Sequence, residues 1–144
     1  MLCGIGLILV NSEGKILVLE ELKDKPIVEK KAGMLSFPLE TLEPPETPDE
    51  TVRRLIKEEL GDNIIVTNIR FVGAFHVIDF ALTLGYAADC NNKIEDFQPW
   101  SDDIKIRGWL SSEELRASFC RKETEPLLRE FLKQSERSKK MSSG

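Results

Sequence analysis

The segment from Thr47 to Gly61 has complete start and stop signals for an α-helix, and it constrains the fold more than any other part of the chain. Thr47 can cap the first turn, Pro48 suits the first helical position, and Glu50 completes a capping box. Gly61 is typical of the residue that follows the C-terminus of a helix. The sequence therefore predicts a helix over residues 48–60, after a proline-rich segment through which no helix can pass.

Runs of β-forming residues lie on both sides of this helix. Five strands are predicted, the first two as a hairpin, at residues 3–10, 15–22, 63–78, 79–90 and 104–110. Two more helices are predicted, one opening at Ser111–Glu114 and one over residues 124–134. This interleaved order predicts an α/β layered domain (α+β type), in which helices cover the faces of a mixed sheet.

The chain of 144 residues suits a single domain, which we place at residues 1–134, with residues 135–144 as a flexible polar tail. Three cysteines without a paired pattern favour free thiols in a reducing compartment over disulfides or a zinc site. The apolar run at residues 1–10 is too short to span a bilayer and lacks a basic leader. We therefore expect a soluble, cytoplasmic protein that does not act at a membrane.

The formal net charge is −5, with a sequence pI near 5.1. A nucleic acid is excluded as the main partner, because its backbone requires clustered lysine and arginine. A small phosphate ligand remains compatible with this charge, provided that a divalent cation lies between the ligand and the protein. We expect a nucleotide-like small molecule as the partner on the grounds given below.

One face of the predicted helix combines apolar residues with a carboxylate. At about 100° per residue, an apolar stripe includes Val52, Leu55 and Leu60, and Glu59 falls inside it while Glu58 falls toward solvent. A glutamate buried in the last turn is unfavourable, since desolvation and the helix dipole both disfavour its charge. Compensation can come from a neighbouring cation (Arg53, Arg54 or Lys57) or from a bound divalent metal, and the helix alone leaves both open.

The segment around this helix resembles the Nudix box, G-x5-E-x7-R-E-U-x-E-E-x-G-U, in which U is bulky and apolar. Glu46 matches the first glutamate and Arg54 the arginine, Glu58 and Glu59 match the glutamate pair, and Gly61 matches the final glycine. With its flanking strands and later helix start, the resemblance covers most of residues 3–133. It implies a MutT-like Nudix α/β/α sandwich with a mixed sheet.

This box is degenerate at four positions. Leu39 and Glu40 replace loop glycines, Leu55 replaces the glutamate after the arginine, and Asp62 replaces the last apolar residue. In the family, carboxylates at the positions of Leu55 and Glu59 lie four residues apart on one helix face and clamp magnesium against a diphosphate. Leu55 removes one of these two carboxylates, and the loss of such a metal ligand commonly lowers the catalytic rate by orders of magnitude.

The resemblance implies a bound Mg²⁺ or Mn²⁺. Glu58 and Glu59 would be metal ligands and catalytic residues, Glu43 would be a compensating ligand, and Asp103 a further acid. Glu46, Arg54 and Gly61 are expected to form the structural part of the motif. Five other residues are candidates for the site, but solvation of the lysines, core packing of the phenylalanines and a packed or hydrogen-bonded histidine are the favoured interpretations: Lys30, Lys31, Phe37, Phe75 and His76.

Two functions remain open at this point. The first is a metal-dependent hydrolase, of weak activity, that cleaves a nucleoside diphosphate linked to another group. The alternative is a catalytically impaired module that binds a nucleotide or regulates a partner, and a homodimer is compatible with the family under both. A large gain in activity from Leu55→Glu would indicate a disabled enzyme. A third interpretation, coincidence of the motif, requires a structure without a loop and helix packed on a mixed sheet.

Overall fold

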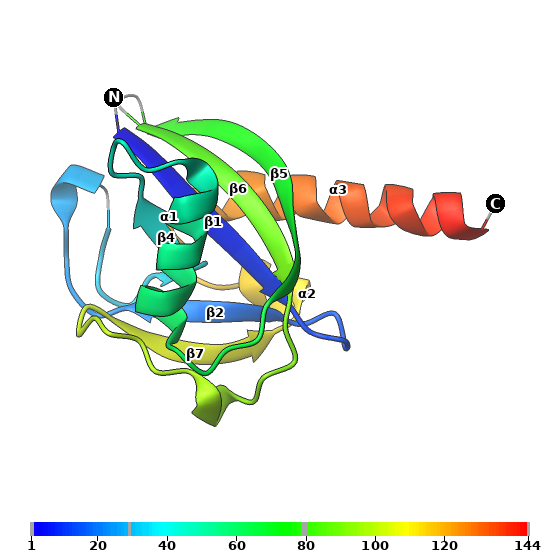
Figure 1. The fold of residues 1–144 in the computed structure, drawn as a ribbon, viewed down its shortest axis with the longest axis horizontal. Coiled ribbons are helices and arrows are strands. Elements are labelled where there is room, and N and C mark those ends of the chain that lie inside the picture. The colour runs from blue at the N-terminus through cyan, green and yellow to red at the C-terminus, as the bar shows by residue number, and fades with distance from the viewer. Residues whose placement is uncertain (1, 29, 79–80, 144) are drawn as a thin grey trace.

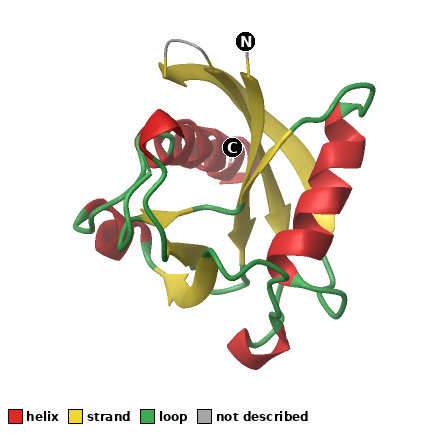
Figure 2. Cartoon of the chain, turned by 90° about the vertical axis from the view of Figure 1, so that its left-hand side faces the viewer, coloured by secondary structure: helices red, strands yellow, loops and turns green. Residues whose placement is uncertain are grey.

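A computed structural model describes residues 2–28, 30–78 and 81–143. The strands are β1 (Leu2–Val10), β2 (Ile16–Glu21), β3 (Leu35–Ser36), β4 (Leu39–Thr41), β5 (Thr67–Ile78), β6 (Ala81–Asp89) and β7 (Ile104–Leu110). The helices are α1 (Pro48–Leu55), α2 (Ser112–Arg116) and α3 (Thr124–Ser143), with a π-helical turn η2 (Ile56–Leu60) and 3-10 turns η1 (Pro26–Val28) and η3 (Ile94–Asp96). Figures 1 and 2 show α1 and α3 on opposite sides of the sheet.

The sheet is mixed, as predicted. Its main strand order is β3-β2-β1-β6-β5, while β4 pairs with β1 and β7 pairs with β2. Only the β1–β6 pair is parallel among the described strands, and it runs from Leu2↔Ala81 to Val10↔Asp89. The predicted hairpin of β1 and β2 survives only at its turn, where Val10 pairs with Ile16. Beyond that pair the strands diverge, because β1 pairs along its length with the distant β6 and β2 pairs with β7.

Two apolar clusters fill the two sides of the sheet. Alternate residues of β1, Ile5, Leu7 and Leu9, belong to the cluster beneath α1, whereas Ile8 belongs to the cluster beneath α2 and α3. This alternation follows the two-residue period of a strand and confirms the predicted α/β/α sandwich. Helix α3 approaches the sheet closely over Gly85, where a Cβ atom would lie only 2.2 Å from a methyl carbon of Leu127.

Several predicted boundaries differ from the structure. Strands β3 and β4 lie in segments that the sequence left without regular structure, because pairing with β2 and β1, rather than local propensity, creates them. Helix α3 continues past the predicted end at residue 134 to Ser143. The assignment of residues 1–134 as the domain and 135–144 as a flexible tail stays a prediction. All three cysteines are free thiols. No helix in the described part of the chain is long and apolar enough to cross a membrane.

Candidate active site

A cleft of about 560 Å³ opens beside the C-terminal end of the α1–η2 helix. Its volume lies in the range of small-molecule sites. Carboxylates from β4 and η2 line it, together with cationic residues and one exposed tryptophan from the segments that surround them: Glu40, Glu58, Glu59, Lys25, Lys30, Arg121 and Trp100. The cleft therefore presents both charges and an aromatic ring to one ligand-sized space.

The π turn η2 determines which side chains of this helix reach the cleft. Gly61 donates its backbone N–H to the carbonyl of Ile56, five residues back, and also to that of Lys57. A π turn holds more residues than an α turn, so the side chains after Leu55 are displaced around the axis from their α-helical positions. Leu60 is fully buried, while Glu59 is only partly buried and lines the cleft. Glu59 therefore lies at the edge of the apolar stripe and not within it.

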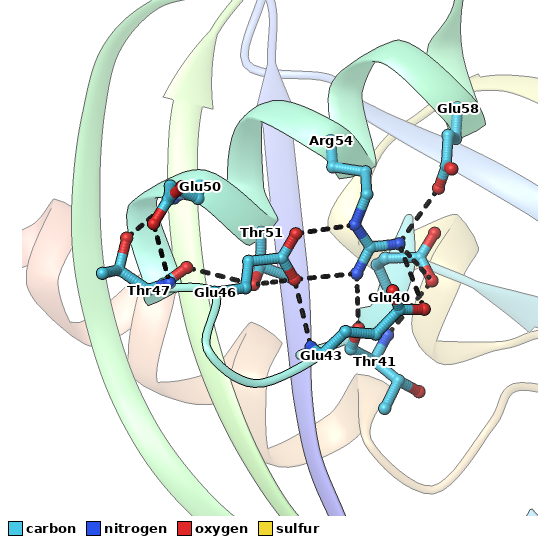
Figure 3. A network of polar contacts seen from close by, with 9 residues as sticks. All are labelled: Glu40, Thr41, Glu43, Glu46, Thr47, Glu50, Thr51, Arg54 and Glu58. Carbon is cyan, nitrogen blue, oxygen red and sulfur yellow. Dashed lines mark hydrogen bonds and ion pairs between the residues drawn. The ribbon is translucent and has the colours of Figure 1, made fainter.

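Arg54 is the centre of a carboxylate network that joins the loop before α1 to the helix (Figure 3). Its Nε and Nη2 atoms donate to the two Glu46 oxygens at 2.8 and 2.9 Å, and Nη2 also donates to the Thr41 carbonyl at 2.6 Å. Its Nη1 atom lies 3.1 Å from Glu58 and 3.2 Å from Glu40. Glu46 thus receives a bidentate contact, the strong geometry for this pair.

Glu59 has no hydrogen-bonded or ion-paired partner among the described residues. Burial raises the pKa of its carboxyl to about 8, and the nearby charges of Glu40 and Glu21 add to this rise, while Lys30 opposes it. A carboxyl of this kind exchanges its proton near neutral pH, which suits a general base. The sequence left a neighbouring cation and a bound metal open as compensation for the glutamate pair. In the structure, Arg54 contacts Glu58 and not Glu59.

A buried charged group that sequence patterns did not indicate lies beside Glu59. Glu21 on β2 is almost fully buried and contacts Lys30 at 2.7 Å and Arg121 at 3.5 Å, and Ser36 donates to it at 3.2 Å. Lys30 and Arg121 both line the cleft. Glu21 and Lys30 lie nine residues apart, but Arg121 lies 100 residues from Glu21, so only the pairing of distant segments brings it to them. The signal available in the sequence was the two-residue period of a strand, which places Glu21 on the same face of β2 as Leu17 and Leu19.

The other predicted site residues are divided between the cleft and positions outside it. Asp103 lines the cleft, but Lys23 and Lys25 each contact it at 3.0 Å, and these hydrogen bonds lower the pKa of its carboxyl to about 2. Glu43, by contrast, does not line the cleft: its side chain is 72% exposed and only 3.9 Å from Arg54. The loop exposes its carboxylate to solvent, and its role as a metal ligand stays a prediction.

Phe37, Phe75 and Lys31 have the structural or solvated positions that the sequence favoured, whereas His76, which was expected to be packed, is exposed. Phe37 is buried in the cluster beneath α3, and Phe75 packs against the same cluster. His76 and Lys31 are exposed and lie outside the cleft. Lys30 also differs from its expected position, since it is buried and reaches the cleft wall.

The carboxylates of the cleft are candidate ligands for a divalent cation. Within residues 2–28, 30–78 and 81–143, no three potential ligands are already arranged around one point. The donor chemistry nevertheless suits Mg²⁺ or Mn²⁺, because Glu40, Glu58 and Glu59 offer only oxygen atoms, the ligands these ions prefer. Metal binding by Glu59 would break no hydrogen bond or ion pair among the described residues, whereas Glu40 and Glu58 would each leave the one Arg54 nitrogen that they share. These residues fit a divalent cation after a rotation of their side chains.

Gly61 ends the helix in a conformation that favours glycine. Its φ of 105° and ψ of 176° lie in a region that other residues rarely adopt, and a Cβ atom would lie 3.0 Å from the Gln98 carbonyl oxygen. We expect Gly61→Ala to lower the free energy of unfolding by about 2–4 kcal/mol, measured by urea denaturation. Gly14→Ala is the control, because Gly14 also has positive φ but no atom within 4 Å of such a Cβ. Equal losses for the two variants would contradict the proposed contact with Gln98.

The pairing of Glu46 with Arg54 predicts a pH-dependent contribution to stability. Hydrogen bonds from Arg54, the Glu43 backbone and Thr51 lower the pKa of Glu46 from 4.5 to about 2. A lowered folded pKa gives stability that is present above pH 4.5 and is lost as the pH falls toward 2. Glu46→Gln should therefore destabilise the protein clearly at about pH 7 and less at about pH 3, by urea denaturation. The exposed Glu113→Gln is the control, and a pH-independent loss would contradict this pairing.

Comparisons with known proteins agree with this architecture. The NUDIX domain family model matches residues 3–134. A NUDIX hydrolase from Nitrosomonas europaea is 18% identical, with a TM-score of 0.69, and the match covers 92% of this chain and 88% of that chain. The NUDIX domain of Shewanella oneidensis NrtR, solved with ADP ribose, is 12% identical with a TM-score of 0.75, and the match covers 93% and 88%.

A MutT protein from Methanosarcina mazei Go1 is 20% identical with a TM-score of 0.59, and the match covers 96% of this chain and 95% of that chain. No curated protein sequence matches this chain. The structural likenesses, all at low identity, show a shared fold, and the family model covers most of the sequence, including the loop, helix and cleft described above. The chain therefore belongs to the Nudix domain family.

Proposed function

We propose that this protein hydrolyses a nucleoside diphosphate linked to another group, in a reaction that depends on Mg²⁺ or Mn²⁺. The observation that carries the proposal is the unpaired carboxylate of Glu59 in a ligand-sized cleft, next to Glu58 and to the cations Lys30 and Arg121. ADP ribose in the NUDIX domain of Shewanella oneidensis NrtR supports this substrate class.

Glu58 and Glu59 would hold the metal ion. A bound ion would neutralise negative charge on the diphosphate and make the attacking water more acidic. Glu59 then accepts a proton from the attacking water, whose oxygen bonds to one phosphorus as the P–O bond of the anhydride breaks. The leaving phosphate takes the electron pair of that bond, and Lys30 and Arg121 stabilise the charge on the phosphate oxygens.

Trp100 is the candidate for contact with the base. Its side chain is exposed at the cleft, with Lys57 Nζ 5.4 Å from the ring centroid, and its backbone N–H donates to the Glu58 carbonyl at 2.8 Å. That bond fixes the loop against the end of the helix. An exposed indole at this position offers a face on which a nucleobase can stack.

The test is incubation of the purified protein with ADP ribose, nucleoside diphosphate sugars and dinucleoside diphosphates, with Mg²⁺ or with a chelator. We expect metal-dependent release of nucleoside monophosphate from at least one of these compounds. Absence of product at high protein concentration would contradict the proposal.

A second candidate function is binding of the same ligand class without hydrolysis. It is favoured by Leu55, which is fully buried and stands where the family has a carboxylate. Calorimetric binding of the same compounds without turnover would select it over the hydrolase.

A further inference from the structure

The family resemblance expects a carboxylate at position 55, and the structure shows what replaces it there. The Leu55 side chain is fully buried in the cluster beneath α1, with Val52 and Leu60, and it does not line the cleft. The helix therefore presents only Glu58 and Glu59 to a metal ion. Mg²⁺ usually binds proteins through one or two carboxylates, and its affinity falls as charged ligands are removed.

A different carboxylate reaches the cleft from strand β4. Glu40 pairs with Ile5 of β1, and directly paired residues project from the same face of a sheet. Since Ile5 packs in the cluster beneath α1, the register directs Glu40 toward that helix. Its side chain is 23% exposed and lines the cleft together with Glu58 and Glu59.

Glu40 and Glu58 converge on one point from these two elements. The same nitrogen, Arg54 Nη1, lies 3.2 Å from Glu40 Oε1 and 3.1 Å from Glu58 Oε2 (Figure 3). A positive charge thus already bridges the two carboxylates. Arg54 would remain anchored if they turned toward another cation, because its other two nitrogens bind Glu46 and the Thr41 carbonyl.

We propose that Glu40 provides the metal carboxylate that position 55 lacks, so that Glu40, Glu58 and Glu59 together bind Mg²⁺ or Mn²⁺. A ligand on the strand then takes the place of a ligand on the helix. This inference rests on the metal dependence of the proposed function. It also gives a role to the replacement of a loop glycine by Glu40, which the sequence pattern had presented only as a loss.

The test is titration of the folded protein with Mn²⁺, with free Mn²⁺ measured by electron paramagnetic resonance. Glu40→Gln keeps the size of the side chain and removes its charge, and we expect it to weaken Mn²⁺ binding by roughly tenfold or more. Glu40→Asp, which keeps the charge, should bind more tightly than Glu40→Gln. Glu13→Gln is the charge-matched control on an exposed turn, and Glu43→Gln tests the ligand expected from the sequence.

The variants distinguish failure of this inference from failure of the proposed function. Weaker binding by Glu40→Gln, with Glu13→Gln and Glu43→Gln unchanged, supports it, even if no substrate is hydrolysed. Unchanged binding by Glu40→Gln in a protein with metal-dependent hydrolysis overturns only this inference. Weaker binding by Glu43→Gln alone would also overturn it in favour of the loop ligand. Failure of the wild-type protein to bind Mn²⁺ overturns both proposals.

Discussion

Leu55→Glu is expected to lower the free energy of unfolding by roughly 4–6 kcal/mol, without a gain in hydrolysis. The Leu55 side chain has 0% exposure and packs among apolar residues from β1, β2, β6 and the helix itself. Removing such a leucine alone commonly costs about 2–5 kcal/mol, and burying a charge in the same space adds a desolvation penalty. Because native domains are stable by only about 5–15 kcal/mol, much of this stability would disappear.

Urea denaturation of three variants separates the loss of packing from the cost of burying a charge. Leu55→Met keeps the volume and should cost less than about 1.5 kcal/mol, Leu55→Ala shows the packing loss, and Leu55→Glu adds the charge. This expectation replaces the test that the motif suggested, in which glutamate at position 55 restores activity. If Leu55→Glu were as stable as the wild type and gained Mg²⁺-dependent turnover, position 55 would reach the cleft, and the packing described here would be wrong.

Glu59→Gln is expected to lower the rate of metal-dependent hydrolysis by roughly 10²–10⁴-fold, because it removes the candidate base and a metal ligand. Glutamine keeps the size of the side chain, so the fold should be retained. The measurement is kcat on the best substrate of the panel, with Glu58→Gln in parallel and Glu113→Gln as an exposed control. Wild-type activity in Glu59→Gln would exclude Glu59 as the base.

The same variant has a second, independent readout in the metal-free protein. The folded pKa of Glu59, about 8, lies above its ordinary value of 4.5, so the folded state holds the proton more tightly than the unfolded state. Ionisation therefore destabilises the fold progressively as the pH rises from 4.5 toward 8. Glu59→Gln should raise the Tm by several degrees at about pH 8 and change it little at about pH 4. An identical Tm difference at both pH values would contradict a raised folded pKa for Glu59.

Local features of the sequence predicted local structure well. The Thr47 cap, the capping box with Glu50 and the glycine at position 61 all occur in the structure, because each depends on contacts within a few residues. The same applies to the contact of Glu46 with Arg54, which lie eight residues apart, just before the N-cap and in the second turn of the same helix. The Nudix spacing extended these local signals to the correct family and sandwich.

Tertiary structure decided the contents of the cleft. The sequence indicated that Leu55 replaces a metal ligand on the same helix face as Glu59. In the structure, Leu55 packs in the core, and the π turn places Glu59 in the wall of the cleft. In the sequence, Glu40 was only a replacement for a loop glycine. In the structure, the register of β4 on β1 directs its carboxylate to the site.

Long-range pairing also decided the charge around the base. Arg121 joins Glu21 and Lys30 only after β2 and the segment before α3 meet in the fold. The sequence by itself determined the helix and its caps, since these depend on neighbouring residues, and the resemblance of its box to the Nudix family indicated the sandwich. Strand register, helix phase and the pairing of distant charges depend on contacts between segments far apart in the chain, so only the tertiary structure decided which carboxylates face a ligand.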